Sequence, residues 1–199
     1  RQRKETEATP DDFYRRAGIY AECGKIICIS TGFLCKVADQ WQFRIKSFSG
    51  HEEAPLLSGF SALLNSHFNR REHRLCAHNG KEFDFPFIAR RLLINGLPLP
   101  SILDISGRKP WEVNLLDTME MWKFGDYKNY TSLALLAAVF GIPTPKDDID
   151  GSMVCQVYWE SKDLDRIASY CQKDVLTVAR LFLRMRGSQA IDDRDVVVV

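Results

Sequence analysis

A long amphipathic segment near the C-terminus places the strongest constraint on how this chain can fold. From Ser161 to about Arg186, apolar side chains recur at spacings of three and four residues, which places them on one face of a helix. A helix with such a face must bury it against another element, so the segment requires a sheet or further helices beside it. The side chains expected on the buried face are Leu164, Ile167, Ala168, Cys171, Val175, Val178, Phe182 and Met185.

Two segments in the first quarter of the chain have the patterns of strands. Residues 25–34 form a continuous apolar run, which predicts a strand buried on both faces. Residues 41–48 alternate between apolar and polar side chains, which predicts a half-exposed strand. Asp39 and Gln40 supply the turn between them. The apolar face of the second strand carries Trp41, Phe43 and Ile45.

The rest of the chain alternates further strands and helices, so we expect an α/β protein with a mixed sheet and a layer of helices on each face. Residues 1–186 are expected to form one domain. Residues 187–199 are expected to form a C-terminal tail that either adds an edge strand or is disordered. The remaining predicted strands are 74–79 and 111–118, and the remaining helices are 52–68, Asp84 to a stop at Gly96, Thr131 to Phe140, and 151–159.

Composition excludes several classes of protein. The chain has 27 basic and 26 acidic residues, so bulk electrostatic attraction cannot be what holds it on nucleic acid, although a local basic groove remains open. Its six cysteines form no C-x-x-C pair, which argues against a zinc ribbon or a thioredoxin-type motif. We interpret them as free thiols in a reducing cytoplasm. No apolar run approaches the length of a membrane span.

Three side chains have the chemistry of a hydrolytic site. Asp84 follows a predicted strand and begins a helix, while Tyr170 and Asp174 are four residues apart on one helix face. Phosphodiester hydrolysis uses carboxylates around two divalent ions about 3.5–4 Å apart, and oxygen ligands suit Mg²⁺ or Mn²⁺. A phenol with a pKa of about 10 is a poor base, so Tyr170 would orient water. The plainer interpretation of Asp84 is a helix cap, and that of Asn79-Gly80 is a tight turn.

These residues resemble the motifs of a known nuclease family. Asn79-x-x-x-Phe83-Asp84 is similar to the second motif of the DEDD 3′–5′ exonucleases, and Tyr170-x-x-x-Asp174 to the third motif of their tyrosine-containing branch. The histidine-containing branch would have His where Ser169 stands. Over roughly residues 20–186, the chain resembles bacterial predicted exonucleases related to the proofreading domain of family-B DNA polymerases.

The resemblance implies a fold, a pair of metal ions, a reaction and a role for each candidate residue. It implies an RNase H-like three-layer fold, two divalent ions (Mg²⁺ or Mn²⁺), and release of nucleoside monophosphates from a nucleic-acid 3′ end, for which we expect single-stranded DNA. Asp84, Tyr170 and Asp174 would be catalytic, and the two carboxylates would bind metal. Asn79 and Phe83 would bind substrate.

The first motif of the family, Asp-x-Glu on a central apolar strand, is not visible in this chain. Asp117 follows an apolar run, but we interpret it as a capping or turn residue. If a central strand normally lies between 25–34 and 74–79, its removal leaves buried N–H and C=O groups unpaired. We therefore expect this first central strand, missing from the chain, to lie upstream of Arg1.

Three functions stay open from the sequence: a metal-dependent 3′–5′ exonuclease, a catalytically inactive RNase H-like binding module, and a partner domain of a larger replication or repair protein. The choice between DNA and RNA and the oligomeric state also stay open. One aromatic segment could either stack bases of a single strand or form a simple lid. Its side chains are Trp122, Lys123, Phe124, Tyr127, Lys128 and Tyr130.

Overall fold

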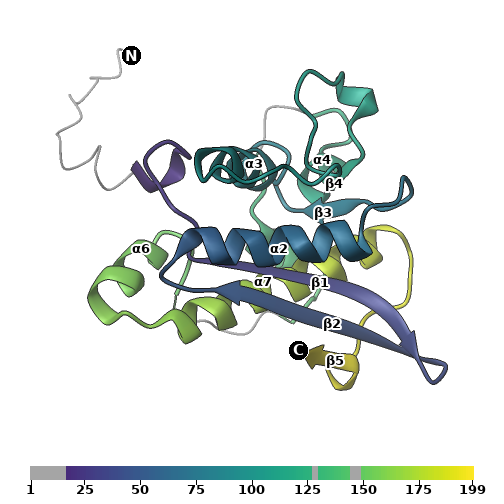
Figure 1. Cartoon of the computed structure of the whole chain (residues 1–199). Coiled ribbons are helices and arrows are strands. Elements are labelled where there is room, and N and C mark those ends of the chain that lie inside the picture. The colour runs from purple at the N-terminus through teal and green to yellow at the C-terminus, as the bar shows by residue number, and fades with distance from the viewer. Residues whose placement is uncertain (1–16, 127–129, 144–148) are drawn as a thin grey trace, which may run out of the picture.

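A long antiparallel hairpin forms the larger part of the sheet (Figure 1). Strand β1 (Cys28–Val37) pairs with β2 (Gln40–Ser49) over their whole length. Ala38 and Asp39 connect the strands with φ angles of 48° and 64°, the left-handed backbone of a two-residue hairpin turn. Both predicted strands are present, with β1 displaced toward the C-terminus and the turn one residue earlier than expected. The predicted burial of the first strand on both faces is wrong, because only Ile29 of β1 is buried and Leu34 is exposed. The computed structural model describes residues 17–126, 130–143 and 149–199.

The C-terminal segment adds a third strand to this sheet. After the short η4 helix (Asp193–Asp195), β5 (Val196–Val198) pairs in parallel with β2, so the strand order is β1-β2-β5. The sheet is therefore mixed, as predicted, and the tail takes the first of its two expected forms, an edge strand. Ile191 is buried against Phe43 and Ile45. The division of the chain at residue 186 stays a prediction.

A second, smaller sheet carries the strand end that matters most for function. Strand β3 (Leu75–Ala77) pairs in parallel with β4 (Leu115–Asp117). Within the described part of the chain, no strand joins this pair to β1. The separation is compatible with the expected central strand, which stays a prediction. The strand predicted over 111–118 is wrong in its first half, where Pro110–Glu112 forms the 3₁₀ helix η2.

Helices cover both faces of the hairpin. Figure 1 shows α2 (Glu53–His67) in front of it and α7 (Leu164–Met185) behind it. Gly32 in β1 lets α7 approach closely, because a Cβ atom there would lie 2.8 Å from Val175 Cγ1. The other described helices are η1 (Ala17–Ile19), α3 (Asp84–Ile94), α4 (Thr118–Lys123), α5 (Leu133–Val139), α6 (Val154–Gln156) and the π-helical η3 (Val157–Ser161).

The predicted starts of α5 and α7 are wrong. In each case the side chain that caps the helix comes later in the sequence than the predicted first residue. Ser132 rather than Thr131 caps α5, since its hydroxyl accepts from the Leu135 N–H at 3.3 Å. Asp163 caps α7, so this helix begins at Leu164 rather than at Ser161. A short polar side chain directly before the first turn can reach the free N–H groups, whereas one farther back cannot.

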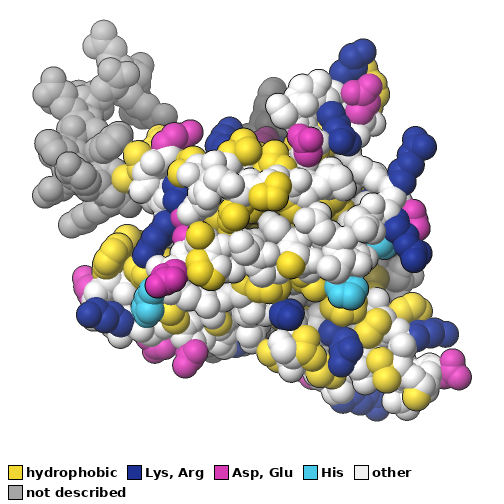
Figure 2. Space-filling view, viewed as in Figure 1, with side chains coloured by type: hydrophobic (Ala, Val, Ile, Leu, Met, Phe, Trp, Pro, Cys, Tyr) yellow, Lys and Arg dark blue, Asp and Glu magenta, His cyan; other side chains and the backbone are white. Residues whose placement is uncertain are grey.

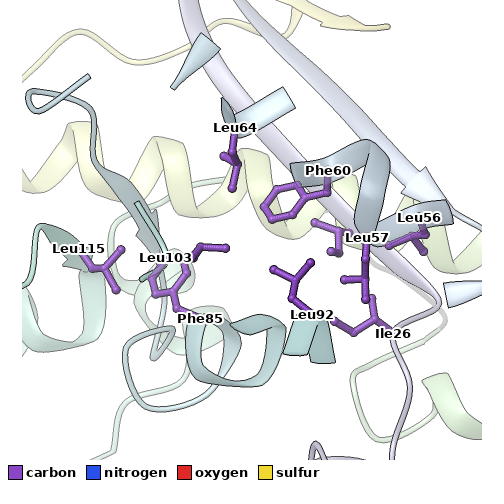
Figure 3. Close-up of a cluster of buried hydrophobic side chains, with 10 residues drawn as sticks. Ile26, Leu56, Leu57, Phe60, Leu64, Phe85, Leu92, Leu103 and Leu115 are labelled. Carbon is purple, nitrogen blue, oxygen red and sulfur yellow. The ribbon is translucent and has the colours of Figure 1, made fainter. Parts of the chain in front are cut away.

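The largest core cluster lies between α2, α3 and β4 (Figure 3). Leu57 and Leu92 are completely buried at its centre. Leu93 was expected on the same face but is 60% exposed, because one residue turns the helix by about 100° and leaves room for only one of two adjacent leucines. The cluster comprises Ile26, Ile29, Leu56, Leu57, Phe60, Leu64, Phe85, Leu92, Leu103 and Leu115.

A buried ion pair joins this core to the segment before β1. Glu53 on α2 accepts from Arg91 Nε at 2.9 Å and from the Ile26 N–H at 2.6 Å. The Arg91 guanidinium also donates to the carbonyl of Ala21 at 2.8 Å. Every partner is satisfied, so the two charges can be buried together. Periodicity did not predict the pair, because charged helix residues are usually solvated.

Candidate active site

The loop between β3 and α3 is tightly wound. Asn79 has a left-handed φ of 61°, and the Phe83 N–H donates to its carbonyl at 3.1 Å. The Phe85 N–H donates to the Gly80 carbonyl at 2.9 Å. A Cβ atom on Gly80 would lie 2.4 Å from Ala77 Cβ, so this position requires glycine. The loop thereby turns the chain sharply from the end of β3 into the first residue of α3, Asp84.

Asp84 is not a helix cap, contrary to its plainer interpretation. Phe83 occupies the cap position of α3, and no side chain caps the helix. Asp84 is exposed as a residue, but protein atoms crowd its carboxylate. This desolvation raises its pKa, and the negative charges of Asp117 and Asp174 raise it further. The acid at the start of α3 and the acid in the middle of α7 therefore lie near each other.

Tyr170 lies beside one of these carboxylates, Asp174. Its half-buried phenol donates a hydrogen bond to Asp174. Desolvation, followed by the charge of Asp174 and this hydrogen bond, raises the pKa of the phenol. Tyr170 therefore stays neutral at physiological pH and can donate or accept hydrogen bonds rather than act as a base.

Asn79 and Phe83 present two further groups on the same loop. The Asn79 Oδ1 atom is buried, and among the described residues it has no hydrogen-bond partner. A buried acceptor without a donor is unfavourable, so an external donor or cation would stabilise it. Phe83 is 45% exposed, with its ring centroid 5.6 Å from that of Phe87. The loop that leads to Asp84 thus carries an exposed aromatic ring and a buried acceptor that no described residue satisfies.

Asp117 has the capping role expected from the sequence. It is 3% exposed, and its side chain caps α4 by accepting from the Met119 N–H at 2.9 Å. It also accepts from the backbone N–H groups of Asn79 at 2.9 Å and Lys81 at 3.1 Å. The carboxylate is thus occupied by backbone donors and does not replace the first acidic motif.

The structure adds one acidic residue that sequence reasoning missed. Asp150 lies close enough to Tyr170 for its charge to raise the pKa of the phenol. A Cβ atom on Gly151 would lie 3.8 Å from the Tyr170 hydroxyl. Asp150 Oδ1 accepts from the Ser152 N–H at 2.8 Å and from its hydroxyl at 2.5 Å, and these bonds lower the pKa of Asp150. The detectable signal was the turn sequence Asp150-Gly151-Ser152.

The oxygen atoms of the candidate site are of the kind that a hard divalent cation prefers. Among the residues that the structure describes, too few of them come together to hold one. Asp84, Asp174 and the Asn79 acceptor offer oxygen atoms, which Mg²⁺ and Mn²⁺ prefer. Over residues 17–126, 130–143 and 149–199, however, no group of three or more His, Cys, Asp or Glu side chains is arranged to hold a metal ion. The described residues therefore offer suitable oxygen donors but no complete set of metal ligands.

Comparison with known families identifies the class of protein. Residues 20–195 match the model of a family described as predicted 3′–5′ exonucleases related to the exonuclease domain of PolB. The chain belongs to this family. The resemblance inferred from the two motifs is thereby confirmed. No curated protein matches the chain significantly.

The aromatic segment of this exonuclease-family chain divides into two kinds of residue. Trp122 packs edge-to-face on Phe140, with ring centroids 5.6 Å apart, so it belongs to the packing of α4. Phe124 is 91% exposed and Tyr130 is also exposed. Tyr127 and Lys128 lie outside the described residues.

Among the helices that the structure describes, none combines the length and apolar character of a membrane span.

Proposed function

We propose that this protein is a metal-dependent 3′–5′ exonuclease that hydrolyses phosphodiester bonds at nucleic-acid 3′ ends and releases nucleoside monophosphates. One observation carries the proposal: Asp84 on α3 lies close enough to Asp174 on α7 for their charges to interact, and the Tyr170 hydroxyl donates a hydrogen bond to Asp174. Membership of a family of predicted 3′–5′ exonucleases supports the reaction class.

Each residue has a defined task in this reaction. Asp84 and Asp174 would hold Mg²⁺ or Mn²⁺, which when bound supplies Lewis-acid activation and neutralises charge on the phosphate. Desolvation and then the charges of Asp117 and Asp174 raise the pKa of Asp84, and cation binding would relieve the repulsion between these charges. Tyr170 orients the attacking water through its hydroxyl.

The substrate that fits best is a single-stranded DNA end. Phe83 offers an exposed ring on which an unpaired base can stack. Asn79 Oδ1 is buried without a partner among the described residues, so a rotation of this side chain would turn the acceptor toward the terminal hydroxyl of a bound strand. Basic and acidic side chains are interspersed on the face shown in Figure 2. Specific contacts near the site, rather than a broad positive surface, would therefore position the strand.

Digestion of 5′-labelled single-stranded DNA with Mn²⁺ tests the proposal. We expect a ladder of shortened products, and a loss on the order of 10²–10³-fold for Asp84→Asn and Asp174→Asn. Tyr170→Phe should lose less, because the carboxylates and cations remain. Asp165→Asn is the matched control, since Asp165 lies on the same helix and is exposed. A protein that binds Mn²⁺ and DNA but produces no ladder would contradict the proposal.

The second candidate, an inactive binding module, is favoured by the incomplete set of acidic ligands within the described residues. Fluorescence anisotropy with the same labelled strand separates the two functions. An inactive module binds the strand with equal affinity in wild type and Asp174→Asn, and shortens it in neither. An exonuclease loses cleavage in the variant while wild type degrades the strand.

A further inference from the structure

Asp117 holds the site loop through backbone groups alone. Its Oδ1 atom accepts from the N–H groups of Asn79 at 2.9 Å and Met119 at 2.9 Å, with a longer bond from Glu120 at 3.4 Å. Its Oδ2 atom accepts from the Lys81 N–H at 3.1 Å. The carboxylate is buried, so these bonds replace its hydration. One side chain therefore joins the first turn of α4 to the loop that leads to Asp84.

Asn79 and Lys81, whose N–H groups bind Asp117, lie on either side of Gly80, where the turn has no space for a side chain. Asn79 holds a left-handed backbone, which is unfavourable for a residue with a side chain. Gly80 has no space for a side chain, and its carbonyl accepts the Phe85 N–H at the start of α3. Bonds from Asp117 on both sides of Gly80 stabilise this conformation. They therefore set where the first residue of α3, Asp84, projects.

We propose that Asp117 is a positioning residue of the active site, which fixes the β3–α3 loop so that Asp84 meets Asp174 and can bind a cation with it. This inference rests on the proposed function but concerns a residue to which the exonuclease reaction assigns no part. Within the described residues, Asp117 accepts four hydrogen bonds, all from backbone N–H groups. It acts through the backbone of Asn79 and Lys81, much as a residue behind a metal ligand orients that ligand.

The arrangement requires a carboxylate rather than any capping group. Asparagine has the same shape but only one acceptor oxygen, so its NH₂ group would face the Lys81 N–H as a second donor. Serine can still cap α4, but its short hydroxyl cannot also hold both loop amides. The two substitutions thus separate the cap of α4 from the attachment of the loop.

The test compares Asp117→Asn and Asp117→Ser with Asp163→Asn, a matched control. Asp163 also caps a helix, by accepting from the Arg166 N–H at 3.0 Å, but has no bond to the site loop. Titration calorimetry with Mn²⁺ should give 10–100-fold weaker binding for both Asp117 variants and unchanged binding for Asp163→Asn. Turnover of single-stranded DNA well below the melting temperature should fall by a similar factor in kcat, with KM changed less than about threefold.

Hydrogen exchange of the backbone amides provides a readout independent of metal and activity. The amides of Asn79 and Lys81 should exchange faster in Asp117→Ser, while those of β1 and β2 keep their protection. If Asp117→Asn does not fold, Asp117→Ser retains the α4 cap and carries the test. Folded Asp117 variants with wild-type Mn²⁺ affinity, or with unchanged exchange at Asn79 and Lys81, would overturn the inference. A wild type that binds Mn²⁺ without cleaving DNA would defeat the proposed function and leave this comparison intact.

Discussion

At the scale of single residues, the ionised carboxylate of Asp84 lies in an unfavourable environment. Its carboxylate is crowded by protein atoms and faces the charges of Asp117 and Asp174, so its pKa is raised. The folded protein therefore holds a proton on Asp84 more readily than the unfolded chain does. The stability that this proton contributes is complete below the ordinary aspartate pKa and is lost as the pH rises through the raised value.

Asp84→Asn should consequently stabilise the metal-free protein at neutral pH. The substitution removes an ionised group from a crowded, negative environment, so its melting temperature in EDTA should exceed that of wild type above the raised pKa. The difference should disappear as the pH falls through that pKa. Thermal denaturation in a series of buffers from pH 3 to 8 measures this. Added Mn²⁺ should raise the melting temperature of wild type alone, and a less stable Asp84→Asn at pH 7 in EDTA would contradict the expectation.

At the scale of elements, the pair Glu53 and Arg91 connects α2 to α3. Burial acts to raise the pKa of Glu53, but hydrogen bonds from Arg91, the Ile26 N–H and Asn95 lower it overall. The contribution of the ionised carboxylate to stability is therefore present above the ordinary glutamate pKa and lost as the pH falls through the lowered value. Because α3 begins with Asp84, this contact also fixes the helix that carries an acid of the candidate site.

Replacing one partner of the Glu53–Arg91 pair should lower the free energy of unfolding far more than replacing both. Arg91→Met leaves a buried, unpaired carboxylate and should lower the free energy of unfolding by about 3–5 kcal/mol. The double variant Glu53→Met/Arg91→Met should recover much of that loss, because it leaves no buried charge. Urea denaturation of the two single variants, the double variant and wild type completes the cycle. Additive losses in the double variant would show that the two side chains do not act as a pair.

At the scale of the whole molecule, the C-terminal segment closes one edge of the fold. Strand β5 covers the edge of β2, and Ile191 is buried in the cluster under α7. The Arg180 guanidinium, buried on α7, donates to the Ile191 carbonyl at 3.2 Å and to Asp193 at 2.5 Å. The segment thus protects a strand edge and pairs a buried charge.

Deletion of residues 187–199 should therefore destabilise the protein and promote association. It leaves Arg180 without these partners and exposes the β2 edge, a template for pairing with another chain. Deletion of residues 196–199 alone is the control, because it removes the strand but keeps Ile191 and Asp193. In thermal denaturation, the melting temperature should fall strongly for the longer deletion and less for the shorter. In size-exclusion chromatography, the longer deletion should associate more than the shorter. Equal behaviour of the two truncations would place the effect in β5 alone.

Local patterns in the sequence determined the elements and the candidate residues. The period of apolar side chains indicated β1, β2, α2 and α7, and residue spacing indicated Asp84, Tyr170 and Asp174. Both are properties of neighbouring residues, so they can be seen without a fold. The exact starts of α5 and α7 were missed because a cap depends on which side chain reaches the first free N–H groups.

Tertiary structure alone decided which of these residues meet. The proximity of Asp84 to Asp174, the bonds from Asp117 to the site loop, and the burial of Glu53 with Arg91 all join segments far apart in the chain. Such contacts follow from how whole elements pack, and no local period encodes them. An aspartate that caps a helix and an aspartate that faces another carboxylate have the same appearance in a sequence. Packing gives the first backbone amides and the second another carboxylate.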